Sequence, residues 1–90
     1  MTSFEFERVS KKCVCTIMKE KHDIDLTVFD LDFVWFNYTL RNMKCMLYSK
    51  LMGQYYAEVT YRDATKEMIV DIYSRSERKV YASSEISLAL

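Results

Sequence analysis

The chain has 90 residues, which is the size of one domain and leaves no room for a second. Its 13 basic and 13 acidic residues give a formal net charge of +0, which speaks against a general nucleic-acid coat and against a polyanionic DNA mimic. Half of the residues are apolar, too many for a disordered chain, and a composition with no proline and one glycine excludes collagen and Gly-rich phosphate loops.

Residues 4–18 fit two local structures. Their alternating start and the β-rich composition that follows favour a β-hairpin. The alternative is a single helix, in which Thr2 and Glu5 form a capping box and the apolar residues recur every three or four positions. Those apolar residues are Phe6, Val9, Cys13 and Ile17. The hairpin is our favoured interpretation, and the helix stays open.

The central segment carries the clearest periodicity of the chain. Its apolar residues recur at steps of three and four, and neither proline nor glycine interrupts them before Gly53. They are Phe29, Phe33, Phe36, Leu40, Met43, Leu47 and Leu51. This spacing predicts one long central helix over residues 28–52, which Thr27 caps and Gly53 ends. The β-branched and aromatic composition of residues 28–36 leaves a partial strand there as the alternative.

After Gly53 the apolar period changes to two. Residues 55–62 and 67–74 alternate and are separated by a turn, and residues 79–83 form a shorter third strand. We therefore predict a small α+β domain over residues 1–90, in which the central helix packs on a three-stranded antiparallel β-meander. The apolar tail at 84–90 either docks or frays.

The predicted central helix is apolar on two opposite sides, whereas a surface helix usually has one apolar face. The second stripe, with its flanking aromatic residues, consists of Leu31, Val34, Trp35, Tyr38, Cys45, Tyr48 and Met52. Either residues 4–18 cover this stripe within one chain, or another protein covers it, including a second copy in a homodimer.

This double stripe leads us to expect a non-enzymatic protein-interaction module. Such a module would bind or inhibit a larger protein partner through its apolar helix face, alone or as a homodimer, in a regulatory role. The short, proline-free composition, rich in Met and Tyr, resembles that of accessory proteins of viruses and phages.

The alternative function is a small nucleic-acid-binding protein. A sheet face with aromatic and basic residues can stack on bases and contact phosphates. The residues that would do so are Arg62, Tyr73, Lys79 and Tyr81. Acidic residues interleave with them in the sequence, which dilutes the positive charge, so protein binding remains the first expectation.

Candidate catalytic and metal-binding residues are sparse. Cys13 and Cys15, with the distant Cys45 and His22, lack the paired short spacings of a zinc site. Two Asp-x-Asp pairs lack the glycine and the distal glutamate of a calcium loop. We expect no catalytic residues, no metal, no cofactor and no small-molecule substrate.

The expected compartment is the cytoplasm. An odd number of cysteines suits a reducing environment. The sequence starts without a basic and apolar signal segment, and no apolar run is long enough for a membrane helix.

Overall fold

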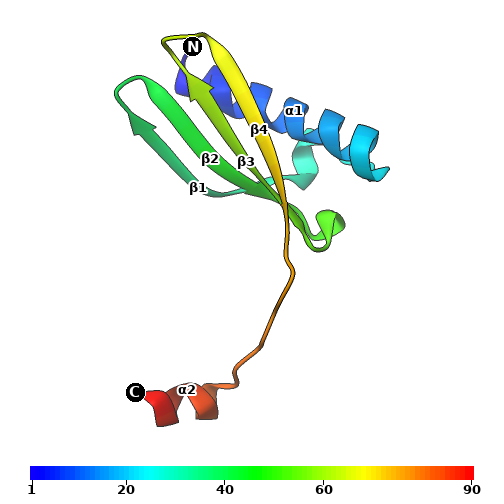
Figure 1. Cartoon of the computed structure of the whole chain (residues 1–90), viewed down its shortest axis with the longest axis vertical. Coiled ribbons are helices and arrows are strands. Elements are labelled where there is room, and N and C mark those ends of the chain that lie inside the picture. Colours follow the sequence, from blue (N-terminus) through cyan, green and yellow to red (C-terminus); the bar gives the residue numbers. More distant parts are fainter.

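A four-stranded antiparallel sheet carries one long helix on one of its faces (Figure 1). The computed structural model describes all of residues 1–90 and shows a small α+β fold. The elements in chain order are α1 (Ser3–His22), η1 (Val28–Asp30), β1 (Asp32–Thr39), β2 (Asn42–Tyr48), η2 (Lys50–Met52), β3 (Tyr55–Arg62), β4 (Glu67–Ser74) and α2 (Ser83–Ala89). Neither helix is both long and apolar enough to cross a membrane.

Residues 4–18 belong to helix α1, so the favoured hairpin interpretation is wrong and the alternative is right. The capping box is present: the Glu5 amide donates to Thr2 Oγ1 at 3.1 Å, and the Thr2 amide donates to Glu5 Oε1 at 2.9 Å. Burial follows a four-residue step through Phe6, Ser10, Val14 and Met18. This buried stripe and the capping box outweigh the β-rich composition, because secondary-structure propensity is weaker than tertiary packing.

The predicted helix over residues 28–52 is wrong, because this segment forms β1 and β2 with a short 3-10 turn on each side. A β-bulge at Val34 shifts the pairing, so that Phe33 and Phe36 face the same side of the sheet although three positions separate them. Leu40 and Arg41, with φ of 50° and 68°, then form the two-residue turn between the strands. The bulge and the turn together imitate helical spacing.

The structure has strands at the predicted residues 55–62 and 67–74, but the sheet contains four strands rather than three. Residues 79–83, predicted as the third strand, are not a strand. The last bond of the β3–β4 pair runs from the Arg75 amide to the Gln54 carbonyl oxygen at 2.8 Å. Beyond this bond, the segment that precedes β3 bends away at Gly53, whose φ is +62°. The residues after Arg75 therefore have no neighbouring strand with which to form backbone hydrogen bonds.

The core lies between α1 and the inner face of the sheet. The strand register places Met43, Cys45 and Leu47 of β2 opposite the inward residues of β3. The complete set of buried apolar residues is Phe6, Val14, Met18, Leu31, Met43, Cys45, Leu47, Met52, Ala57, Val59 and Tyr61. Phe6 also meets Phe36 edge to face, with ring centroids 5.7 Å apart. Residues 3–74 form this packed body.

The C-terminal arm, defined as residues 75–90, leaves the body at the end of β4 and runs away from it (Figure 1). Every residue from Tyr73 to Leu90 is exposed, including all of α2. Sequence analysis left two alternatives for residues 84–90, and of these the docking on their own chain is not seen.

Candidate functional site

The residues predicted to form one partner-binding helix face do not share a surface. Leu31, Cys45 and Met52 are at most 2% exposed and belong to the core of the chain itself. Trp35 pairs with Met46 on the outer face of the sheet, whereas Tyr38 pairs with the inward Met43. The remaining two are Val34, which is exposed at the bulge, and Tyr48, which is half-buried. Because the segment is not a helix, the predicted helix-face surface does not exist.

The four residues of the nucleic-acid alternative lie in two places. Arg62 and Tyr73 share the outer sheet face, where Arg62 pairs with Glu67 and Tyr73 stacks on Tyr56 with ring centroids 5.2 Å apart. Lys79 and Tyr81 lie in the C-terminal arm, with the Lys79 ammonium 5.3 Å from the Tyr81 ring centroid.

Acidic groups occupy the middle of the outer sheet face. Glu58 and Asp71 lie directly opposite each other on β3 and β4. Lys44 pairs with Glu58 at 2.9 Å, which offsets one of the two charges. The structure therefore separates Arg62 from Tyr73 by negative charge rather than joining them into a basic patch.

The cysteines and His22 are spread over the body. Cys45 is fully buried, and burial raises the pKa of its thiol to about 11, while the nearby Ser10 hydroxyl has the smaller opposing effect. Burial, followed by the charge of Asp30, also raises the pKa of the Cys15 thiol. His22 stacks on Tyr55 with ring centroids 4.1 Å apart. No three His, Cys, Asp or Glu side chains lie close enough together to form a metal site.

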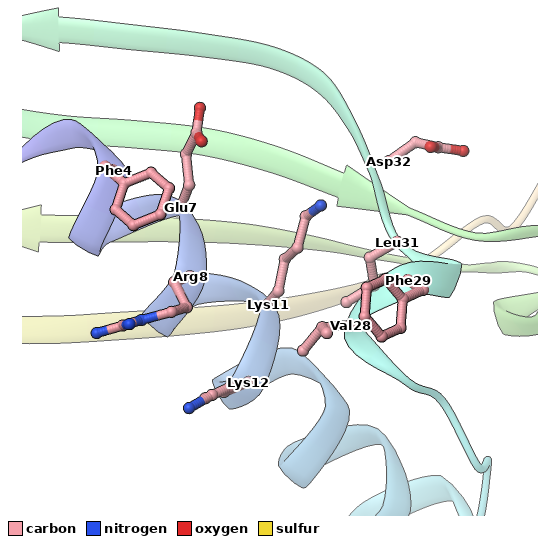
Figure 2. A pocket seen from close by; sticks show the side chains of 9 residues that line it. All are labelled: Phe4, Glu7, Arg8, Lys11, Lys12, Val28, Phe29, Leu31 and Asp32. Carbon is pink, nitrogen blue, oxygen red and sulfur yellow. The ribbon is translucent and has the colours of Figure 1, made fainter.

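A groove of about 490 Å³ lies between the N-terminal half of α1 and the η1 turn (Figure 2). Two phenylalanine rings at the groove are open to solvent: Phe4 is 69% exposed and Phe29 is 93% exposed. Figure 2 shows the Lys11 side chain rising from α1 between these two rings. The nine lining residues are Phe4, Glu7, Arg8, Lys11, Lys12, Val28, Phe29, Leu31 and Asp32.

The local sequence explains how the groove forms. In η1 the Asp30 carboxylate accepts from the Thr27 amide at 2.8 Å and from the Thr27 hydroxyl at 3.0 Å, which fixes the turn. Leu31 then anchors the segment in the core, at 2% exposure, and leaves Phe29 outside. On α1, Arg8 and Lys12 extend away from η1, whereas Lys11 rises toward the strands (Figure 2).

The groove has charged groups of both signs. Arg8, Lys11 and Lys12 form none of the four salt bridges of the chain, and two carboxylates, Glu7 and Asp32, also line the groove. Three cations against two carboxylates leave one excess positive charge. The Lys11 ammonium lies 5.0 Å from the Phe33 ring centroid, a cation–π distance.

The C-terminal arm is the second unpartnered apolar feature. Its large apolar side chains are between 51% and 101% exposed. They are Val80, Tyr81, Ile86, Leu88 and Leu90. Sequence reasoning identified neither the groove nor the arm as an exposed apolar surface. It placed Phe29 in a buried helix stripe and Tyr81 in a strand.

Comparison with known proteins places the chain in a family. A model described as "Family of unknown function (DUF6275)" matches residues 7–83. The chain belongs to the DUF6275 family. The part that matches the DUF6275 model contains most of α1 and all four strands, and it ends where α2 begins. Searches among curated proteins and among solved structures find no match to this DUF6275 chain.

Proposed function

We propose that this chain is a non-enzymatic protein-interaction domain that binds another protein chain through its C-terminal arm. The observation that carries the proposal is the complete exposure of residues 75–90 together with their apolar content. Exposed apolar side chains that gather in one segment mark a surface for protein contact. The domain then acts by occupying a partner's surface and so inhibiting or regulating that partner.

The length of α2 supports the same conclusion. It has seven residues, and isolated helices shorter than about 12–15 residues are marginal in water. Its N-cap residue, Ala82, makes no side-chain capping bond. Such a helix is stable only when its apolar side chains pack against something, and its own body does not supply that contact. A second chain does so in our proposal.

The chemistry of the groove supports a non-enzymatic role. Its lining consists of apolar side chains, three cationic groups and two carboxylates, without a thiol, hydroxyl or imidazole. Histidine is the most frequent general base of enzymes, and serine and cysteine are frequent nucleophiles, so the groove offers none of these three. The free cysteines elsewhere in the chain fit the reducing environment of the cytoplasm, which we propose as the compartment.

The test compares the wild-type chain with the arm variant Ile86→Asp/Leu88→Asp. The matched control is Leu40→Asp, an exposed leucine at the β1–β2 turn, 88% exposed and outside both the arm and the groove. We expect the wild type and the control to associate with a protein chain, their own or another, in light scattering or in quantitative capture from the native host. The arm variant should lose that association. Equal association of all three chains would overturn the proposal.

Nucleic-acid binding is the second candidate function. It is favoured by the Tyr73 ring, which is 41% exposed on the outer sheet face, and by the Lys79–Tyr81 pair in the arm. The central Glu58 and Asp71 oppose it. A gel-shift titration with single-stranded DNA and RNA at low salt tests this candidate. A shift that weakens steeply with salt and is lost in Tyr73→Ala and Lys79→Glu would support it, and no shift at all would remove it.

A further inference from the structure

We propose that the arm binds the β1 edge of a second copy of this chain, with residues 84–90 extended as a fifth strand of that copy's sheet. This inference rests on the proposed function and names both the partner and the mode of binding. Two copies then exchange their arms around a two-fold axis, so that each β1 edge receives one strand.

The apolar side chains of the arm suit an extended strand better than a helix. In α2, Ile86 and Leu90 lie on one side, whereas Leu88 lies about 200° round the helix from Ile86. One surface therefore cannot cover all three while the segment is helical. In an extended strand every second residue points the same way, so Ile86, Leu88 and Leu90 form one apolar side, and Ser87 and Ala89 form the other. Because α2 is short and uncapped, the change of conformation costs little.

Strand β1 is a sheet edge with little protection against a further strand. The strand order leaves one side of β1 without a neighbour, and residues 33–39 contain neither a charged residue nor proline. Charged residues, proline and bulges are the usual features that block such an edge. The bulge at Val34 protects only the start of β1. The other edge strand, β4, carries the charges of Glu67 and Asp71. The edge open to another strand is therefore β1.

The backbone of β1 has unpaired hydrogen-bonding groups at regular intervals along this edge. The two-residue turn at Leu40 and Arg41 closes on the pair Thr39 and Asn42. This closing pair is hydrogen-bonded, and the bonds then alternate along the strand. The backbone groups of Phe36 and Tyr38 therefore point away from β2. An added strand is the occupant that bonds to them in sequence.

The two sides of β1 also match the two sides of the extended arm. Helix α1 lies over β2, β3 and β4 and leaves the inner side of β1 open, so that Phe36 is 38% exposed and Tyr38 is 60% exposed. On the outer side of the same stretch lie the polar Asn37 and Thr39. The apolar side of the arm covers the two rings, and its Ser87 side lies beside the polar residues.

The position of the arm favours a second copy over the chain's own β1. The arm leaves the sheet at β4, the opposite edge, and residues 75–90 are all exposed as they run away from it (Figure 1). To reach its own β1, the arm would have to turn back across three strand spacings, about 14 Å. Residues 75–82 contain neither glycine nor proline, the residues that most readily reverse a chain.

The composition of the two stretches favours a second copy over an unrelated protein. Residues 33–39 and residues 86–90 are both free of charge, so their pairing places no like charges opposite each other. Each chain has one open edge and one uncovered arm. A reciprocal exchange between two copies fills both and leaves neither exposed.

The first experiment is light scattering of the full chain over a range of concentrations. We expect a mass that approaches twice the 10.8 kDa of one chain. Tyr38→Asp in β1 and Leu88→Asp in the arm should each weaken the dimer by about tenfold or more, because each places a charge in an apolar contact. Circular dichroism verifies that both variants, altered at exposed positions, remain folded.

The matched control is Phe29→Asp, because Phe29 is 93% exposed but belongs to the groove beside α1. Its dimer should be as stable as that of the wild type. A Phe29→Asp chain that loses the dimer would place the arm in the groove and overturn the proposal.

A mixing experiment tests the exchange itself. Tyr38→Asp chains keep an intact arm, and Leu88→Asp chains keep an intact β1 edge. When the two variants carry different tags and are mixed, one contact between arm and edge is restored, so each should capture the other more strongly than it captures itself. If each arm bound its own β1, or if two β1 edges paired with each other, this preference would be absent, and that result overturns the proposal.

Amide hydrogen exchange tests whether the arm binds as a strand. On dimerisation, exchange should slow at the amides of Phe36 and Tyr38 and within residues 86–90. The Asn37 amide, which already lies on the β2 side, should change little. A dimer in which the Phe36 and Tyr38 amides exchange as fast as in the monomer overturns the proposal.

The outcomes separate this inference from the proposed function. A wild-type chain that stays monomeric while it captures another protein through its arm overturns the inference and leaves the proposed function standing. A wild-type chain with no arm-dependent association of any kind overturns both.

Discussion

The packed body and the C-terminal arm differ in what covers their apolar side chains. In the body, α1 covers the inner sheet face, and Phe6, Val14 and Met18 are 0% exposed. In the arm, Val80 is 72% exposed and Leu88 is 90% exposed, with no layer over them. The core of the body is covered within one chain and the apolar side chains of the arm are not, so we expect stability to reside in the first and association in the second.

The largest effect expected from a single substitution is Phe6→Ala. Removing a fully buried phenyl ring that also packs on Phe36 should lower the free energy of unfolding by about 3–5 kcal/mol. Urea denaturation monitored by circular dichroism measures this change. Leu88→Ala in the arm and Phe4→Ala on the same helix are the controls, each expected within about 0.5 kcal/mol of wild type under monomeric conditions. Equal losses in all three would remove the distinction between body and arm.

Alkaline pH provides the next largest effect. Folding raises the pKa of the Cys45 thiol from 9.0 to about 11, because burial disfavours the thiolate. The resulting stabilisation is complete below pH 9 and is lost as the pH rises through about 11. We expect a loss of about 2 kcal/mol from this group. Denaturation at several pH values should show a shallower alkaline decline for Cys45→Ala, and an identical decline would contradict the assignment.

The β1–β2 turn tests whether the body can be improved without touching the arm. Leu40 and Arg41 both have positive φ, a conformation that is costly for side chains of their size. Leu40→Asn/Arg41→Gly supplies the pair that suits a two-residue hairpin turn, and it should stabilise the body by about 1–2 kcal/mol. Thermal unfolding measures the gain. The oligomeric mass should not change, and a change in mass would place this turn in the interface.

The smallest effect is expected at Ser10. Its hydroxyl lies on the buried side of α1, near the Cys45 thiol, and makes no hydrogen bond of good geometry. Ser10→Ala removes this unpartnered group and improves helix propensity, so it should raise the free energy of unfolding by about 1 kcal/mol. Thr16→Ala serves as the control, because the exposed Thr16 hydroxyl donates to the Lys12 carbonyl oxygen at 3.0 Å. A larger gain at Ser10 than at Thr16 isolates the cost of the buried hydroxyl.

Local patterns predicted the elements whose spacing is regular. Residues 55–62 and 67–74 alternate without interruption, and both are strands in the structure. The capping box at Thr2 and Glu5 also predicted the start of a helix, but the β-rich residues after it weighed more heavily in the sequence interpretation. Val14 and Met18 are buried because α1 packs on the sheet, and the strands of that sheet lie later in the sequence. The sequence of residues 4–18 alone therefore does not show this burial.

The central segment was misread for a geometrical reason. A bulge adds one residue to β1 and so shifts which side chains face the core. The turn at Leu40 and Arg41 interrupts the two-residue alternation a second time. Apolar residues at 33, 36, 40, 43 and 47 then have helical spacing although the chain is extended. Whether a spacing of three is a helical step or a bulged strand depends on the partner strand, which periodicity alone does not show.

The candidate interaction residues were beyond sequence reasoning for the same reason. Phe29 is exposed because Leu31 takes the buried place, and Arg8 and Lys11 line a groove because η1 lies beside α1. These are contacts between elements distant in sequence. The composition did suggest a protein-binding role, which stays a prediction, but it assigned that role to a helix that does not form.

The meander topology has a consequence for how the chain folds during synthesis. Each strand pairs with its neighbour in the chain, so the sheet grows hairpin by hairpin through short loops, which is a rapid route. Helix α1 is synthesised before the strands, and the strands that bury Phe6 and Met18 follow later. In a nascent chain the apolar face of α1 therefore stays exposed until β3 has been synthesised. The chain is most prone to aggregate during this interval.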